Sequence, residues 1–233
     1  MESNFLSKYL YARFTDELTL PRGKHKGVTV TVARDTGCDA IPVVKEVIKQ
    51  LNADLQGAYK DQPWRYMSKE ILEQSAKKLN MKPELLDKLI HQKDRNIVEE
   101  ILLSLSTENY PNDIKIKRTI KEVVQSAEQE GAVIVVGRAG VAIVAHSKRN
   151  LHVKLTAPLE WRVAKIAKEY KVSEEQALKH IKESDKQREN LRKYFMGRKV
   201  QPTDYDLILN VATLTKKEVV KAMVELIRFR CLK

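Results

Sequence analysis

Three charged residues in the last quarter of the chain could act on a phosphoryl group. Asp185, Arg188 and Arg192 are three and four residues apart, so on a helix all three share one face. Two arginines one turn apart, oriented by a carboxylate, can neutralise charge on a phosphoryl group while it is transferred. A salt-bridged surface helix produces the same spacing, so both interpretations stay open from this pattern alone.

A fourth arginine, Arg138, lies in the sequence GRAG (137–140), directly after the apolar run AVIVV. In an open parallel sheet, ligands bind beyond the carboxyl ends of the strands. A guanidinium group at that place can form two hydrogen bonds to a phosphate, while Gly137 and Gly140 let the backbone turn sharply. The alternative is a plain strand-to-helix turn whose arginine points to solvent.

The segment VTVTVARDTGCDAIPVVKEV (28–47) reads as a strand, a turn at Gly37 and a helix. This is the arrangement in which a helix N-terminus holds a phosphate. The lysine and the Ser/Thr hydroxyl of a standard phosphate loop do not follow Ala40. The sequence therefore predicts an anion site at this turn, but one of altered composition.

The elements that must position these residues alternate between strands and helices. We expect strands at 28–33, 132–136, 151–156 and 205–210. We expect helices at 1–20, 41–52, 69–79, 82–91, 96–105, 115–131, 158–170, 173–195 and 215–229. Such alternation predicts an α/β fold with a parallel sheet and right-handed crossovers. The helix-only block from 69 to 130 is too long for one crossover, so we interpret it as an inserted helical region.

Composition predicts a soluble protein with a real core. Of the 233 residues, 42% are hydrophobic, and no apolar run approaches the ~20 residues that a membrane helix needs. The first residues also lack the layout of a secretory signal, so we expect a cytoplasmic protein without a membrane partner. Two cysteines and five scattered histidines give neither a disulfide framework nor metal-ligand spacing, so we expect no metal ligands from these side chains. The sequence leaves the oligomeric state open.

The net charge of +12 is concentrated in two places. Residues 161–200 hold 12 basic and 6 acidic side chains, and residues 21–34 hold four basic and no acidic ones. Such clusters suit an anionic ligand, whether a nucleotide or a nucleic acid. A solvated helical face with spare lysines is the other explanation.

Six segments, in chain order, resemble the cytidylate kinase-like family of P-loop nucleotide kinases. They are VTVTVARDTGCDAIPVVKEV, YMSKEIL, AVIVVGRAG, APLEWRVAKI, SDKQRENLRKYFMGR and YDLILN. The match runs from about residue 28 to 229. It implies a three-layer P-loop kinase-like fold in 28–233, with a helical acceptor-side insertion at about 60–130 and a helical lid at about 171–200. Residues 1–27 would form a separate N-terminal helix and basic linker.

The resemblance also implies an activity and the residues for it. The activity is transfer of the γ-phosphoryl group of ATP to a nucleoside monophosphate, with Mg²⁺. The implied phosphate-binding turn consists of Arg34, Gly37, Cys38, Asp39 and Ala40. The implied substrate-binding residues are Ser68, Arg138 and Arg162. The implied catalytic residues are Arg138, Asp185, Arg188 and Arg192.

The chain departs from the family at the turn and at the acceptor side. The family's G-S-G-G is Gly37-Cys38-Asp39-Ala40 here, and an Asp of the acceptor segment is replaced by Ser68. An ionised Asp39 would use the amide groups that a phosphate needs and would repel it, by roughly 1 kcal/mol per unit charge at ~4 Å in water. Arg34, or a Mg²⁺ held partly by a turn carboxylate, would reverse that repulsion. We expect Cys38 to pack rather than to react.

Three functions therefore stay open. The first is an ATP-dependent phosphotransferase acting on a nucleoside monophosphate. The second is a catalytically impaired homologue that binds a nucleotide or regulates a partner. The third is a nucleic-acid-binding protein that uses the basic 161–200 stretch, although the chain contains no recognised nucleic-acid-binding module, so nucleic acid is the least expected partner.

Overall fold

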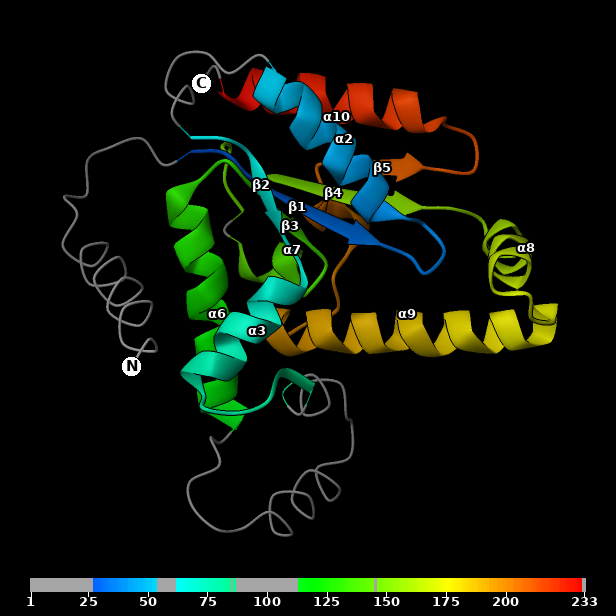
Figure 1. The fold of residues 1–233 in the computed structure, drawn as a ribbon, viewed down its shortest axis with the longest axis horizontal. Coiled ribbons are helices and arrows are strands. Elements are labelled where there is room, and N and C mark those ends of the chain that lie inside the picture. The colour runs from blue at the N-terminus through cyan, green and yellow to red at the C-terminus, as the bar shows by residue number, and fades with distance from the viewer. Residues whose placement is uncertain (1–26, 54–61, 85, 87–112, 145, 232–233) are drawn as a thin grey trace, which may run out of the picture.

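Five parallel strands form a sheet with helices on both faces (Figure 1). The computed structural model describes residues 27–53, 62–84, 86, 113–144 and 146–231. The strands are β1 (Thr29–Arg34), β2 (Arg65–Met67), β3 (Val133–Val136), β4 (Leu151–Thr156) and β5 (Leu207–Asn210). Their spatial order is β2-β3-β1-β4-β5, so β1 and β3 are neighbours at the centre. This is the predicted α/β class with a parallel sheet.

The alternation of side chains along the central strands builds two separate apolar layers. Val30 and Val32 of β1 pack on one face together with Ile134 of β3. Val133 and Val135 of β3 point to the opposite face and join a second cluster. Because both faces are covered, these strands are almost entirely buried; β3 is wholly apolar, whereas β1 also buries Thr29 and Thr31.

Helices cover the two faces unequally. On one face lie α2 (Ala40–Ala53) and α10 (Lys216–Cys231), and on the other lie α3 (Lys69–Lys78), α6 (Asp113–Glu130) and the short α7 (Gly140–Ile143) (Figure 1). The remaining helices are α8 (Leu159–Tyr170), α9 (Glu174–Met196) and the 3₁₀ turn η2 (Pro202–Asp204). Figure 1 shows α8 beyond the arrowheads of β1 and β4, at the carboxyl edge of the sheet.

The long helix α9 connects that edge with the layer below the sheet. It begins at Ser173, whose hydroxyl accepts a hydrogen bond from the backbone N–H of Gln176 at 3.2 Å, and the Gln176 side chain accepts one in return. Its first half packs on α8 through Ile181, whereas Leu191 and Phe195 near its end join the apolar cluster under the sheet. The predicted helix with a Ser173 cap is confirmed.

The predicted strands and most predicted helices agree with the structure to within a few residues. β2 was not predicted, because a strand of three residues carries too little pattern. The expected helices at 1–20, 82–91 and 96–105 lie wholly or mostly outside the described residues. The helix-only block follows β2 and lies in the β2–β3 connection, and its interpretation as an insertion stays a prediction. In the described ranges, no helix combines the length and apolar character that crossing a membrane requires.

Two helix-terminating glycines allow a matched test of backbone strain. Gly131 and Gly197 both have positive φ, +73° and +79°. A side chain at Gly197 meets no atom within 4 Å, whereas a Cβ at Gly131 would overlap the backbone of Gly27. We predict that Gly197→Ala lowers the free energy of unfolding by about 1–2 kcal/mol, the cost of a left-handed L-residue, and that Gly131→Ala lowers it by distinctly more. Urea unfolding of both variants checks this, and equal losses would contradict the packing at Gly131.

Candidate functional site

A pocket of about 180 Å³ opens at the carboxyl edge of β1 and β3. Four arginines from three parts of the chain line it: Arg34 at the end of β1, Arg138 in the turn before α7, and Arg188 and Arg192 on α9. Ser68, which precedes α3, lies on the same pocket. Four guanidinium groups around a small volume make a strongly positive hollow, which favours an anion.

The environment of the pocket changes the pKa of Arg34. The pKa of its guanidinium is lowered from 12.5 to about 10, mainly by burial and in addition by the positive charges of Arg188 and Arg138, against the raising effect of Asp39. Arg34 is still protonated at neutral pH. Because neighbouring positive charges contribute to the lowered pKa, an anion in the pocket would favour the charged form of Arg34.

The turn that presents Arg138 is strained. Three successive residues, Gly137, Arg138 and Ala139, have positive φ values of 71°, 47° and 56°. A left-handed conformation costs an L-residue roughly 1–2 kcal/mol, so two such residues persist only where their surroundings hold them. The Arg34 guanidinium fills the space where a Cβ on Gly137 would stand. The first glycine of GRAG is therefore favoured by its positive φ, and a Cβ there would displace the Arg34 guanidinium.

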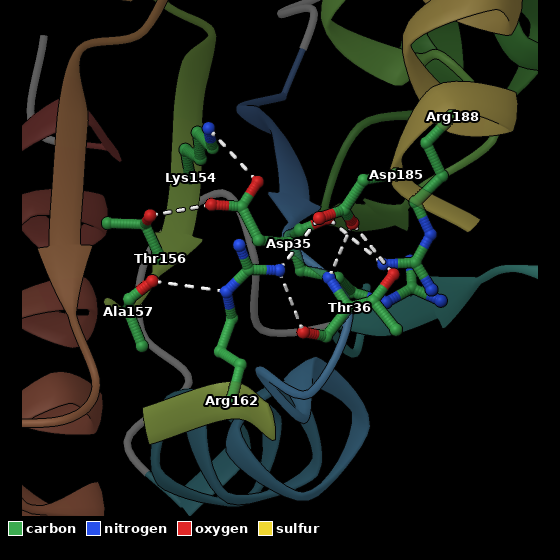
Figure 2. A network of polar contacts seen from close by, with 9 residues as sticks. Asp35, Thr36, Lys154, Thr156, Ala157, Arg162, Asp185 and Arg188 are labelled. Atoms are coloured by element: carbon green, nitrogen blue, oxygen red, sulfur yellow. Dashed lines mark hydrogen bonds and ion pairs between the residues drawn. The ribbon is translucent and has the colours of Figure 1, made fainter. Parts of the chain in front are cut away.

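A polar network ties α9 to the turn after β1 (Figure 2). The carboxylate of Asp185 accepts hydrogen bonds from the backbone N–H and the hydroxyl of Thr36, at 2.8 and 2.7 Å. Arg162 of α8 donates to the other oxygen of Asp185 at 2.7 Å and to the carbonyl of Thr36 at 3.2 Å. One turn further along α9, Arg188 donates to the carbonyl of Arg34 at 3.1 Å.

The network keeps Asp185 ionised. Burial disfavours the carboxylate, but the hydrogen bonds from Thr36 and the ion pair with Arg162 outweigh it, so the pKa of Asp185 lies below its ordinary 3.8. Its oxygen holds the Thr36 amide in the turn where a bound phosphate was expected. Asp185 therefore positions α9 in this structure and does not line the pocket.

The turn itself contains two carboxylates, Asp35 and Asp39, and each pairs with a lysine. Asp35 contacts Lys154 of β4 at 3.1 Å and accepts a hydrogen bond from the Thr156 hydroxyl at 2.6 Å. Asp39 contacts Lys165 of α8 at 2.6 Å. Within the described ranges, no group of three or more His, Cys, Asp or Glu side chains could hold a metal ion. Both carboxylates of the turn are therefore engaged by lysines in this structure.

The residues predicted from the sequence separate into two groups. Around the pocket lie Arg34, Ser68, Arg138, Arg188 and Arg192. Behind it, in or against the turn, lie Gly37, Cys38, Asp39, Ala40, Arg162 and Asp185. In the second group, the hydrogen bonds of Arg162 run to Thr36, Asp185 and the carbonyl of Ala157.

Sequence reasoning missed Thr36 and Lys165. Thr36 is 5% exposed and holds Asp185 through two hydrogen bonds. Lys165 donates to the carbonyl of Gly37 at 2.9 Å as well as to Asp39. A signal for Lys165 existed, because it lies three residues after Arg162 and therefore shares its helix face. No local sequence pattern predicts the contact of Thr36 with Asp185, because the two residues are 149 positions apart.

Residues 29–213 match the cytidylate kinase-like family. The chain belongs to this family. Within it, the cytidylate kinase of Methanopyrus kandleri is 31% identical over 136 residues, which cover 54% of this chain and 67% of that protein. The resemblance inferred from the six sequence segments is confirmed, and a kinase-like, nucleotide-directed function is supported by the family and by this relative.

Comparison with solved structures bears on the fold alone. An uncharacterized protein from Eubacterium ventriosum superimposes with a TM-score of 0.58 at 16% identity, over 88% of this chain and 99% of that one. A shikimate kinase from Bacteroides thetaiotaomicron gives a weaker similarity, with a TM-score of 0.45 at 11% identity over 86% and 98% of the two chains. At such low identity, the likeness concerns the fold alone.

The network at Asp185 predicts a stability difference between two carboxylates of α9. Asp185→Asn leaves the largely buried Arg162 without its anionic partner, so we expect a loss of about 1–3 kcal/mol in the free energy of unfolding. The control is Glu189→Gln, which removes an exposed ion pair with Lys199 and should cost less than about 1 kcal/mol. Equal effects in denaturant unfolding would contradict the network.

The variant Asp185→Asn also tests how the free energy of unfolding depends on pH. Because the folded-state pKa of Asp185 is depressed, its stabilisation is present above the ordinary value of 3.8 and is lost as the pH falls through the lower folded value. The stability gap between the wild type and Asp185→Asn should therefore narrow below about pH 4. A gap that stays constant from pH 6 to pH 3 would show that ionisation of Asp185 plays no part.

The two cysteines should differ in reactivity. Burial, and then the negative charge of Asp35, raise the pKa of the Cys38 thiol to about 11, and its side chain is 2% exposed. Cys231 near the end of α10 is partly exposed. At pH 8 we expect a thiol reagent to modify Cys231 readily and Cys38 only after unfolding. Peptide mass mapping with and without denaturant measures this, and early labelling at Cys38 would contradict its packing role.

Proposed function

We propose that this protein transfers the γ-phosphoryl group of ATP to a nucleoside monophosphate in the arginine-lined pocket. One observation carries the proposal: Arg34, Arg138, Arg188 and Arg192 line a single hollow at the carboxyl edge of a parallel sheet. This is the edge at which open α/β sheets bind ligands. Membership of the cytidylate kinase-like family supports nucleotides as the ligand class.

We assign different roles to the arginines according to the elements that carry them. Arg138 is fixed by a strained turn, so it is suited to grip the acceptor phosphate in one place. Arg188 and Arg192 approach from α9 and neutralise charge on the transferring group. In the transfer, an oxygen of the acceptor phosphate bonds to the γ-phosphorus while the bond to the β–γ bridging oxygen breaks, and ADP leaves. Such a reaction depends mainly on positioning and electrostatics.

We assign the donor phosphates to the side of the pocket where Arg34 meets the 34–40 turn. Ala40 begins α2, and the turn before it comprises Gly37, Cys38 and Asp39. Mg²⁺ usually binds through substrate phosphates and only one or two carboxylates. Since Asp35 and Asp39 are already paired with lysines, the ion would arrive with the nucleotide, and no step of the proposal depends on a protein-held metal.

A second candidate is a homologue that binds a nucleotide without turning it over. The contact between Asp185 and the Thr36 amide favours it, because a carboxylate there competes with a phosphate for the turn. The substitution of the family's loop glycine and serine by Asp39 and Cys38 points the same way. The two candidates share the arginine-lined pocket and differ only in whether ADP is formed.

Ligand binding and turnover separate these candidates. We predict that ATP·Mg²⁺ and a monophosphate raise the melting temperature, and that Arg192→Ala weakens ATP or monophosphate binding at least about tenfold, which corresponds to one lost charge-assisted contact. The control is Arg118→Ala, an exposed arginine of α6 outside the pocket. CMP is the first acceptor to test, because the relative from Methanopyrus kandleri is named a cytidylate kinase.

A coupled assay for ADP then decides between turnover and binding alone. Formation of ADP only with both substrates present supports the phosphotransferase. Stabilisation without ADP selects the binding homologue. No stabilisation by any nucleotide, together with salt-sensitive binding of DNA or RNA, would overturn both and revive the nucleic-acid alternative. A cytoplasmic location and the roles assigned to single residues remain predictions.

A further inference from the structure

Lys165 of α8 lies against the turn that precedes α2. Its ammonium group donates to the carbonyl of Gly37 at 2.9 Å and to the carboxylate of Asp39 at 2.6 Å. The Lys165 side chain is 31% exposed and that of Asp39 is 55% exposed, so the pair stands at the rim of the turn. The two residues are 126 positions apart in the sequence, and the fold alone brings them together.

One face of α8 fixes the backbone of this turn. Arg162 donates a hydrogen bond to the carbonyl of Thr36 at 3.2 Å, and Lys165 donates one to the following carbonyl, that of Gly37. A Cβ added to Gly37 would lie 3.3 Å from the Cβ of Arg162 and 3.4 Å from Ile166, so the turn packs closely on α8. Two successive carbonyl groups therefore point toward α8. This contact holds their partial negative charges on the α8 side of the turn.

Asp39 presents an electrostatic problem for an anion site. It directly precedes the N-terminus of α2, where the helix dipole and the first amide groups favour either a carboxylate or a phosphate. An unpaired carboxylate there would repel the doubly charged phosphate. In the structure the carboxylate instead contacts the ammonium group on α8.

We propose that Lys165 is a positioning residue that makes the turn receptive to phosphate. It neutralises the charge of Asp39 and holds that carboxylate against α8, so that the first turn of α2 can face an anionic ligand. A cation from a neighbouring helix thus compensates for the carboxylate in this turn. The inference rests on the proposed nucleotide binding and deepens it.

A double-mutant cycle tests this role on the full chain. Affinities for ATP and for inorganic tripolyphosphate are measured by calorimetry for the wild type, Lys165→Met, Asp39→Asn and the double variant. We expect Lys165→Met to weaken both ligands at least about tenfold, Asp39→Asn to bind at least as well as the wild type, and the double variant to return to within about threefold of it. The control is Lys168→Met, on the exposed side of α8, which should bind like the wild type.

The rescue distinguishes positioning from direct contact. If the double variant stays as weak as Lys165→Met, Lys165 touches the phosphate itself and the inference is overturned. It is also overturned if the wild type binds and Lys165→Met binds equally well. Should Lys165→Met fail to fold, Lys165→Arg keeps the charge and Lys165→Gln removes it, and only the second should lose affinity. A wild type that binds neither ligand overturns the proposed function first, and this inference with it.

Discussion

The contact between Asp185, Thr36 and Arg162 sets the geometry on which the site depends. It joins the turn after β1 to two consecutive helices, α8 and α9, which follow more than 120 residues later in the sequence. Because a helix repeats every 3.6 residues, fixing Asp185 against the turn also fixes the side chains three and seven residues later on the same face. Arg188 and Arg192 are those residues, and both line the pocket.

The pocket combines features that disfavour the folded state. Strands and helices have apolar faces inward and charged residues outward, whereas the pocket gathers four like charges and holds Arg138 and Ala139 in a left-handed conformation. Each feature destabilises the folded chain on its own. Local rules broken together at one place are typical of a functional site, and here they coincide with the carboxyl edge of the sheet.

Much of the fold follows from sequence pattern, and part of the site does too. The runs VTVTV and AVIVV predict buried strands because apolar and β-branched residues dominate them. The shared face of Asp185, Arg188 and Arg192 follows from helical spacing. The pairs Asp39–Lys165 and Asp185–Thr36 could not be predicted, since each joins residues more than 120 positions apart that only the completed fold makes neighbours. The family resemblance implied a substrate contact for Arg162, and in this structure its hydrogen bonds run to protein groups.

The two ends of α9 pack in different apolar clusters. Leu191 and Phe195 near its end pack in the apolar cluster beneath the sheet, whereas Ala177 and Ile181 in its first half pack against α8. A helix of 23 residues is about 34 Å long, so a tilt about the end beneath the sheet would swing its beginning through many ångströms and move Arg192 hardly at all. Such a swing breaks the hold of Asp185 on the turn yet leaves the charge on the sheet side in place. Release of Asp185 from the turn would therefore not require Arg192 to leave the pocket.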